Sequence, residues 1–286
     1  MDQHLLGSLV QTTTTDGVRL DGFLHLPDGC NEVWILVHGV NSNFYSSRLL
    51  VDLANLLIDD AQGVLLVNTR GHDILSFNTG PSPMQVGSQV ESLSSSLLDL
   101  QAWYEFLLAK GVNFISLLGH SLGALKCCLW VHQSSHNIKR WIAISPPRLN
   151  TELLISDPEK GSIFRGHLRD AAELCASGNP NHVMKVRFPM PMWICASAYC
   201  DKYGSGQKHD YVVVAPSIQI PSLWVFGQLE VESGSSNFNN ANVVLSDAIE
   251  ASHPSPPAQI RVIAGGDHSY HDARPELFRC IRDWMS

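Results

Sequence analysis

Charged residues are scarce in this sequence: they make up 16% of its 286 residues, compared with roughly a quarter in an average soluble protein. Their balance is acidic, with 19 lysines and arginines against 27 aspartates and glutamates and a formal net charge of −8. A protein that binds nucleic acid usually presents clustered lysine and arginine to the phosphates. The composition therefore argues against a nucleic-acid partner.

Long apolar runs are also missing. No uninterrupted stretch approaches the roughly 20 residues that a membrane-spanning helix requires. The first residues, 1–7, do not combine a basic segment with an apolar one, so we expect no signal peptide. These features predict a cytoplasmic protein without a membrane span.

Cysteine is present but unpatterned. The seven cysteines are odd in number and form no C-x-x-C pair, which favours reduced thiols in a reducing compartment. The sequence leaves open a single disulfide within residues 175–200. The histidine–aspartate pairs at 72–73 and 209–210 match no metal-site spacing, and we expect neither a metal nor a cofactor.

What the chain does contain is a regular alternation of strand and helix patterns. Residues 8–14 and 18–26 alternate around an Asp-Gly turn and predict a β-hairpin. Buried strands are predicted from apolar runs at 32–37, 63–68, 114–118, 138–144, 222–227 and 259–263. Helices are predicted at 47–58, 90–108, 124–130, 241–251 and 275–284. This order specifies a mostly parallel sheet with helices on both faces.

The alternation breaks once. Residues 148–220 are richer in charge, methionine, proline and glycine, and only a helix at 166–177 stands out within them. We interpret this segment as an insertion over the sheet and not as a separate domain. The prediction is thus a single domain over residues 1–286, with a core at 1–147 and 221–286 and a lid at 148–220.

The core is organised around a serine between two glycines, in the pattern G-x-S-x-G. The apolar strand 114–118 runs into Gly119, Ser121 and Gly123, and a buried helix follows directly. Strand, sharp turn and helix form the context of a nucleophile elbow, in which the turn lifts the serine hydroxyl clear of the sheet. We predict that Ser121 is a nucleophile.

A serine nucleophile needs a positioned base. Among 13 histidines, His268 follows the last predicted strand in a Gly-Gly-Asp-His turn, at the sheet edge where Ser121 should emerge. A carboxylate after the preceding strand should orient the imidazole, and Glu230 is favoured there. Glu232 remains an alternative, and Asp267 a weaker one because it adjoins His268 in sequence.

Two backbone N–H groups should stabilise the developing oxyanion. We expect one from Leu122, directly after the nucleophile, and one from Val40, in the loop after the first central strand. Gly39 should let that loop turn, and His38 should brace it. Arg70, in the Arg-Gly-His-Asp loop that follows the next strand, is expected to hold neighbouring loops together.

Substrate contacts are predicted for four residues near these groups. They are Gly39, His120, Phe44 and Trp193. The apolar stretch 188–193, which contains Trp193, should pack the lid first and contact substrate second.

Taken together, these motifs resemble the α/β-hydrolase superfamily over nearly the whole chain. The resemblance rests on the His38-Gly39 loop, the elbow at 119–123, and the turns at 227–230 and 265–268. It implies an α/β-hydrolase fold with about eight strands, a Ser121–His268–Glu230 triad and a lid after the sixth strand. Aspartate is the commoner acid at the Glu230 position, so this chain departs from the pattern there.

The predicted activity is cleavage of a carboxylic ester by a serine hydrolase, through an acyl-enzyme. The same groups would serve a thioesterase, lipase, amidase, peptidase or acyltransferase, or, less in keeping with them, a receptor that only binds a small ligand. The expected partner is a small-molecule ester or thioester. The sequence indicates no oligomeric state.

Overall fold

An eight-stranded sheet forms the centre of the computed structural model, which describes residues 6–30, 32–81, 83–133, 136–204 and 206–286. In the sheet the strands follow the order β1-β2-β4-β3-β7-β8-β11-β12. β1 and β2 are antiparallel, β2 pairs antiparallel with β4, and every pair from β4 to β12 is parallel. Their bounds are Ser8–Thr13, Arg19–His25, Glu32–Val37 (β3), Gly63–Val67 (β4), Phe114–His120 (β7), Ile138–Ile144 (β8), Ser222–Gly227 (β11) and Ala258–Ile263 (β12).

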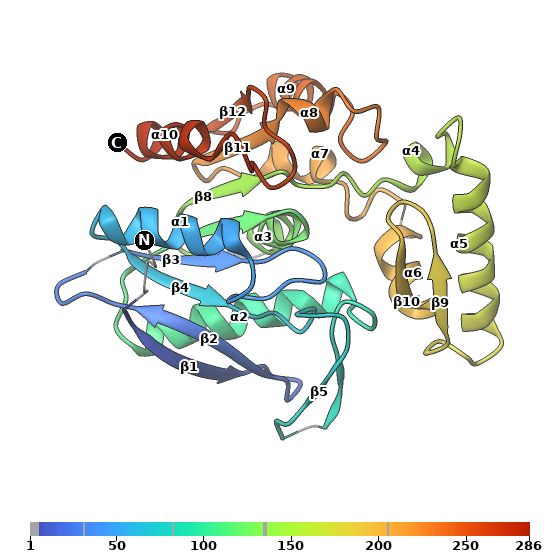
Figure 1. Cartoon of the computed structure of the whole chain (residues 1–286), viewed down its shortest axis with the longest axis horizontal. Coiled ribbons are helices and arrows are strands. Elements are labelled where there is room, and N and C mark those ends of the chain that lie inside the picture. The colour runs from blue at the N-terminus through green and yellow to red at the C-terminus, as the bar shows by residue number, and fades with distance from the viewer. Residues whose placement is uncertain (1–5, 31, 82, 134–135, 205) are drawn as a thin grey trace.

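Helices cover both faces of this sheet (Figure 1). α1 (Arg48–Asp59) and α10 (Arg274–Met285) pack their apolar side chains into one buried cluster. α2 (Leu93–Ala109), α3 (Leu122–Gln133) and α9 (Ala241–Glu250) contribute to a second cluster. Because β3 and β4 are buried along their whole length, continuous apolar runs were the correct signal for them. The predicted mostly parallel sheet with helices on both faces is confirmed.

Between β8, the sixth strand of the sheet, and β11 the chain leaves the sheet. It forms α4 (Thr151–Ile155), α5 (Gly161–Ala176), the hairpin β9 (Val183–Val186) and β10 (Met192–Cys195), and then α6 (Ala196–Tyr203). Figure 1 shows these elements beyond the tips of the parallel strands. The short α7 (Tyr211–Val214) and 3-10 helix η1 (Ala215–Ser217) then return to pack against α3 and α9.

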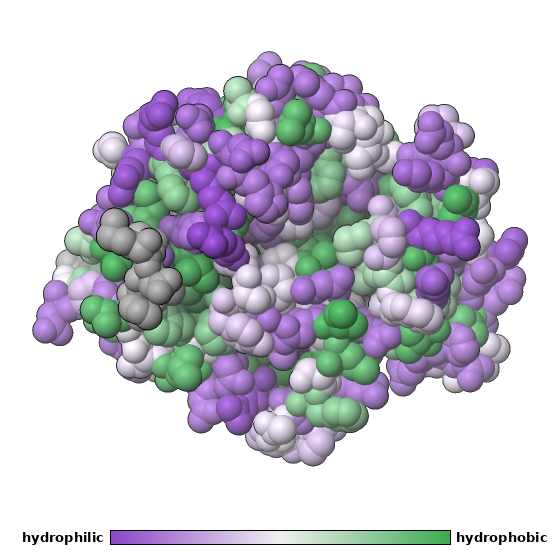
Figure 2. Space-filling view, in the orientation of Figure 1, coloured by the Kyte–Doolittle hydropathy of each residue, from purple (hydrophilic) through white to green (hydrophobic). Residues whose placement is uncertain are grey.

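The remaining elements are short: the hairpin β5 (Ser76–Asn78) and β6 (Met84–Val86), and α8 (Gln228–Val231). Within the described residues, no helix is long and apolar enough to cross a membrane. Hydrophilic and hydrophobic residues are interspersed over the face shown in Figure 2. Residues 1–5, which entered the expectation about a signal peptide, lie outside the described residues.

Candidate active site

The elbow forms where β7 meets α3. Ser121 lies between them in the left-handed region, with φ of 56°, which is rare for a non-glycine residue. A Cβ on Gly119 would lie 2.5 Å from the Ala124 Cα, and one on Gly123 would lie 2.3 Å from the Val37 carbonyl oxygen. Only glycine therefore lets strand and helix pass this closely. The Ser121 N–H is anchored by the Ile144 carbonyl at 2.8 Å.

The imidazole of His268 lies between a hydroxyl and a carboxylate. Its Nε2 is 2.9 Å from Ser121 Oγ, and its Nδ1 is 2.5 Å from Glu230 Oε1. Because an ionised carboxylate only accepts hydrogen bonds, Nδ1 carries the proton and the neutral ring leaves Nε2 free to accept from Ser121. The imidazole also packs edge-on against Phe238, with ring centroids 5.3 Å apart.

Glu230 is buried, and its second oxygen is also fully engaged. It sits at the third position of α8, where its Oε2 accepts from the Gly227 N–H at the start of the helix, 3.0 Å away. Ser145 Oγ donates to the same oxygen at 2.5 Å. Since that hydroxyl has given up its only proton, Tyr270 OH donates to Ser145 Oγ at 2.9 Å.

The side chains of the two alternative acids, Glu232 and Asp267, bond to groups other than His268. Glu232 is exposed, and its Oε1 accepts from Gln228 Nε2 at 3.0 Å. Asp267 accepts from the backbone N–H groups of Ser269 and His271, and its Oδ2 lies 2.7 Å from His271 Nδ1. Glu230 is thus the carboxylate that this structure places on His268.

His120 holds the loop that carries His268. Its Nε2 lies 2.8 Å from the His268 carbonyl oxygen, so Nε2 must carry the proton. Burial, assisted by His268, lowers the pKa of His120 to about 4, and the ring is neutral at pH 7. His120 was predicted to contact substrate; in the structure its ring bonds to the His268 carbonyl and packs against the His268 imidazole, with ring centroids 4.9 Å apart.

The loop after β3 approaches Ser121 closely. A Cβ on Gly39 would lie 2.9 Å from Ser121 Cβ, so a glycine is required there. His38 lies beneath, fully buried, with Nδ1 donating to the Gly39 carbonyl at 2.7 Å and Nε2 accepting from the Thr69 N–H at 3.2 Å. Burial and the nearby Lys126 lower the pKa of His38 to about 3, so it is a neutral brace, as expected.

A cavity of about 370 Å³ opens over these groups. Its wall combines Val40, Ser121, Leu122, Glu230 and His268 with apolar side chains from both the core and the 148–220 segment. The apolar and aromatic lining residues are Pro147, Leu149, Pro189, Met190, Met192, Tyr203, Leu229 and Phe238. Val40 and Leu122, the predicted oxyanion donors, are therefore both at the cavity wall.

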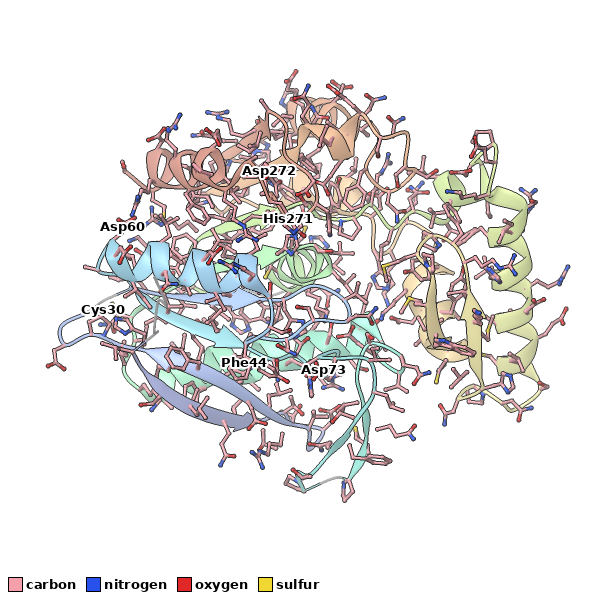
Figure 3. The ribbon with its side chains drawn as sticks, in the orientation of Figure 1. Cys30, Phe44, Asp60, Asp73, His271 and Asp272 are labelled. Carbon is pink, nitrogen blue, oxygen red and sulfur yellow. The ribbon has the colours of Figure 1, made fainter. Side chains whose placement is uncertain are left out.

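None of the four predicted substrate contacts is among the residues that line this cavity, although Gly39 and His120 line an adjoining pocket that also contains Ser121 and His268. Phe44 follows β3, where its N–H donates to Asn68 Oδ1 at 3.1 Å; Figure 3 shows it near Asp73, to which the neighbouring Asn43 is bonded. Trp193 points from β10 toward solvent, 54% exposed, with the Lys185 ammonium over its ring. The structure brings Gly39 and His120 to Ser121, but not Phe44 or Trp193.

Arg70 has the bracing role that was expected. Its guanidinium donates to both Asp16 oxygens, at 2.7 and 3.0 Å, and to Asp99 at 2.9 Å. These contacts join the β1–β2 turn to α2. Within the described residues, no group of three or more histidine, cysteine, aspartate or glutamate side chains is arranged to hold a metal ion.

Sequence reasoning missed several residues of the site: Ser145, Tyr270, Phe238 and Lys202. Ser145 was visible only as the end of a strand before two prolines, and Tyr270 only as a loop residue after His268. Neither position carries a spacing or composition signal, because their contact joins residues 125 positions apart. Lys202 and Phe238 reach the cavity from segments without a regular pattern.

Comparison with known proteins agrees with this architecture. Residues 34–279 match the alpha/beta hydrolase family. No curated protein sequence is significantly similar to the chain.

Solved structures of similar fold cover nearly the whole chain. Est1E from Butyrivibrio proteoclasticus, solved with ferulic acid bound, is 17% identical with a TM-score of 0.69, over 96% of this chain and 98% of that one. The alpha/beta hydrolase GrgF from Penicillium sp. sh18 is 17% identical with a TM-score of 0.69, over 98% of both chains. An esterase from Pyrococcus furiosus is 15% identical with a TM-score of 0.62, over 98% of this chain and 90% of that one. With the family matched over most of its length, the chain belongs to the alpha/beta hydrolase family.

Proposed function

We propose that this protein is a serine hydrolase that cleaves a small carboxylic ester, with Ser121, His268 and Glu230 as its catalytic triad. One observation carries the proposal: the His268 imidazole lies 2.9 Å from Ser121 Oγ on one side and 2.5 Å from Glu230 Oε1 on the other. Both distances are within the reach required for proton transfer and for orientation of the base.

Acylation begins when Ser121 Oγ attacks the ester carbonyl carbon and His268 Nε2 takes the hydroxyl proton. The carbonyl oxygen becomes an oxyanion, which accepts hydrogen bonds from the Val40 and Leu122 N–H groups. Leu122 begins α3, so the partial positive charge at that helix end favours the anion. The tetrahedral intermediate then collapses, His268 protonates the leaving alcohol, and an acyl-enzyme on Ser121 remains.

Deacylation repeats these steps with water as the nucleophile. His268 removes a proton from water, hydroxide attacks the acyl carbon, and Ser121 leaves with the proton returned by His268. Glu230 stabilises the imidazolium in both halves of the reaction. We propose residues 148–220 as a lid over this site, a role supported by the cavity-lining side chains it contributes, such as Leu149 and Met192.

The ester substrate is supported by the fold relatives and by the cavity. Two of the similar structures are an esterase of Pyrococcus furiosus and Est1E with ferulic acid bound. A cavity of about 370 Å³ with mainly apolar walls suits a small molecule. We also propose a cytoplasmic location, in keeping with seven cysteines that are all free thiols.

The test is turnover on matched nitrophenyl esters of increasing chain length, beside the corresponding thioesters and anilides. The proposal predicts hydrolysis of short esters with a rate at least about 10³-fold above the anilides. A preference for thioesters or anilides would reassign the same triad to a thioesterase or an amidase. Stoichiometric ligand binding without any turnover would indicate a receptor.

A further inference from the structure

Lys202 is a buried cation among the residues that line a mainly apolar cavity, which the carboxylates Glu230 and Asp267 also line. It lies on α6 of the 148–220 segment, its side chain is 2% exposed, and it lines the cavity that also contains Ser121 and His268. Buried lysines are rare unless the ammonium is paired. The partners of this ammonium therefore decide what the cavity can accept.

Two protein groups engage the ammonium. Lys202 Nζ donates to the Ser88 carbonyl at 3.2 Å and lies 3.4 Å from Glu91 Oε2. An ammonium has three donors, so a third has no acceptor among the described residues.

The Glu91 carboxylate is shared, because it contacts the ammonium groups of both Lys126 and Lys202. Its Oε1 lies 2.5 Å from Lys126 Nζ, which also donates to Thr69 Oγ1. Burial alone would raise the pKa of Glu91, but Lys126 and Lys202 together lower it, so its charge is kept. One buried carboxylate thus faces two buried ammonium groups.

Two neighbouring carboxylates, Asp201 beside Lys202 and Asp99 beside Lys126, lie within electrostatic reach of the two ammonium groups. Asp201, 21% exposed, directs its two oxygens to the Leu93 N–H and the Ser94 hydroxyl. His38, whose pKa is about 3, is neutral at pH 7. Burial lowers the pKa of Lys202, and Glu91 and Asp201 oppose that shift. Within the set of Glu91, Lys126 and Lys202 themselves, two ammonium groups share one carboxylate, in a setting where an uncompensated charge is costly.

We propose that Lys202 binds an anionic group of the substrate, and that the substrate is a small ester carrying a carboxylate at the far end of an apolar chain. The carboxylate would use the free ammonium donor and balance the buried charge, while the apolar chain lies against side chains such as Leu149, Met192 and Tyr203. This inference rests on the proposed esterase function and names its substrate class.

The experiment compares nitrophenyl half-esters of dicarboxylic acids, from adipate to sebacate, with nitrophenyl esters of equal chain length that end in a methyl group. A second series compares acetyl esters of ω-hydroxy acids with acetyl esters of alcohols of equal length. This series tests whether the carboxylate belongs to the alcohol part of the substrate. For one of these series we expect kcat/KM of the wild type to favour the anionic member by about 10-fold or more, as a charge-assisted hydrogen bond allows. Lys202→Met should abolish the preference, and Lys202→Arg should keep part of it.

Lys208 provides the matched control. It is an exposed lysine six positions further on whose Nζ donates to Ser94 Oγ, and it does not line the cavity. Lys208→Met should leave the preference unchanged. Thermal melting and fluorophosphonate labelling of Ser121 verify that each variant folds. If Lys202→Met does not fold, the inference is tested by the preference of the wild type for anionic esters and by whether Lys202→Arg keeps part of that preference.

Two results would overturn the inference: a wild type that turns over neutral and anionic members of both series equally, or a folded Lys202→Met that keeps the preference. Failure of the esterase proposal is distinguishable, because then no neutral ester is turned over and Ser121 is not labelled. Calorimetric binding of the free dicarboxylates to Ser121→Ala, with and without Lys202→Met, needs no turnover. Equal binding to those two proteins would also count against a role for Lys202.

Discussion

The carboxylate of Glu230 receives three hydrogen bonds, from His268 Nδ1, the Gly227 N–H and Ser145 Oγ. A carboxylate held on both oxygens cannot rotate away from the imidazole, so the imidazole is itself fixed toward Ser121. Because of these hydrogen bonds, the imidazole is already oriented toward Ser121 when a substrate binds. The proposed triad therefore depends on residues that never touch the substrate.

The first prediction concerns which carboxylate, Glu230 or Glu232, is the acid of the proposed triad. Glu230→Gln replaces an accepting oxygen with an amide that cannot stabilise the imidazolium, so kcat should fall by about 10³-fold or more. Glu232→Gln is the matched control, because Glu232 is exposed and its carboxylate accepts from Gln228 in the same turn. Its kcat should stay within about twofold of the wild type. Steady-state kinetics on one ester measures both, and the reverse order would move the acid to Glu232.

Ser145 and Tyr270 give a second prediction, as positioning residues. Ser145→Ala removes a donor from Glu230 Oε2 and leaves the Tyr270 hydroxyl without its partner, so kcat should fall by roughly 10-fold while KM changes little. Tyr270→Phe should cost less, because Ser145 still donates to Glu230. The double variant should be no slower than Ser145→Ala, since both act through one contact. Fully multiplicative losses would show that the two side chains act separately.

The third prediction concerns His120, whose protonation should make the free energy of unfolding depend on pH. Its pKa is about 4 in the folded protein because it is buried, against an ordinary value of 6.5. Below pH 6.5 the unfolded chain binds a proton that the folded protein excludes, so stability is full above pH 6.5 and is lost as pH falls toward 4. The loss should reach about 3 kcal/mol.

The measurement is the free energy of unfolding from pH 7.5 to 4, for the wild type and for His120→Asn, which can still donate to the His268 carbonyl. The His120 contribution is the difference between the two curves, because His38 and the oppositely acting Asp99, whose pKa is raised by burial to about 6, are present in both. Parallel curves would show that His120 does not titrate in this range.

At the residue scale, the sequence indicated those candidate groups that lie within a local motif. Ser121 was predicted from the glycines on either side, and His268 and Glu230 from their positions after predicted strands; the structure brings the three side chains together. The hydrogen bond from Ser145 to Glu230 was invisible, because it depends on β8 ending beside α8 in space. The contacts of Lys202 were invisible for the same reason.

At the scale of elements, the crossing of α3 over β3 depends on Gly123. Gly123→Ala would place a methyl group 2.3 Å from the Val37 carbonyl and 2.5 Å from the His38 carbonyl. Neither backbone group can move without shifting the sheet, so the variant should lose about 3 kcal/mol or more of stability, or fail to fold.

Gly166 provides the opposite case within a helix. It lies inside α5, and nothing within 4 Å would meet an added Cβ. Gly166→Ala should therefore gain about 0.5–1 kcal/mol, because alanine loses less backbone entropy than glycine on forming a helix. Thermal unfolding of both variants tests the pair. A stable Gly123→Ala protein would show that the elbow is less tightly packed than its backbone distances indicate.

Core elements were predictable where hydrophobic periodicity was strong. α1, α9, α10 and the buried strands begin and end within two residues of the predicted ranges. The insertion was harder: the predicted helix 166–177 is observed as α5, Gly161–Ala176, and the hairpin of β9 and β10 was not foreseen. Proline and methionine dominate residues 188–193, and each strand of that hairpin has only four residues, so no alternation could develop.

At the scale of the whole molecule, the loops at the end of the sheet carry the proposed triad, and the 148–220 segment supplies part of the cavity wall. Glu230 and His268 follow neighbouring parallel strands, β11 and β12, so their loops meet at the same edge of the sheet. This edge carries the proposed triad, and residues of the 148–220 segment such as Leu149 and Met192 line the cavity beside it. The fold was therefore predictable from strand order, but the shape of the cavity was not.

The central claim, that Ser121 is an activated nucleophile, is tested most directly by active-site labelling. A fluorophosphonate would be added to the wild type and to Ser121→Ala, and the modified residue located by peptide mass mapping. We predict one label per chain, on Ser121, and none on the Ser121→Ala protein, which should melt at a temperature close to that of the wild type. An unlabelled wild type, or a label that persists in Ser121→Ala, would contradict the proposed mechanism.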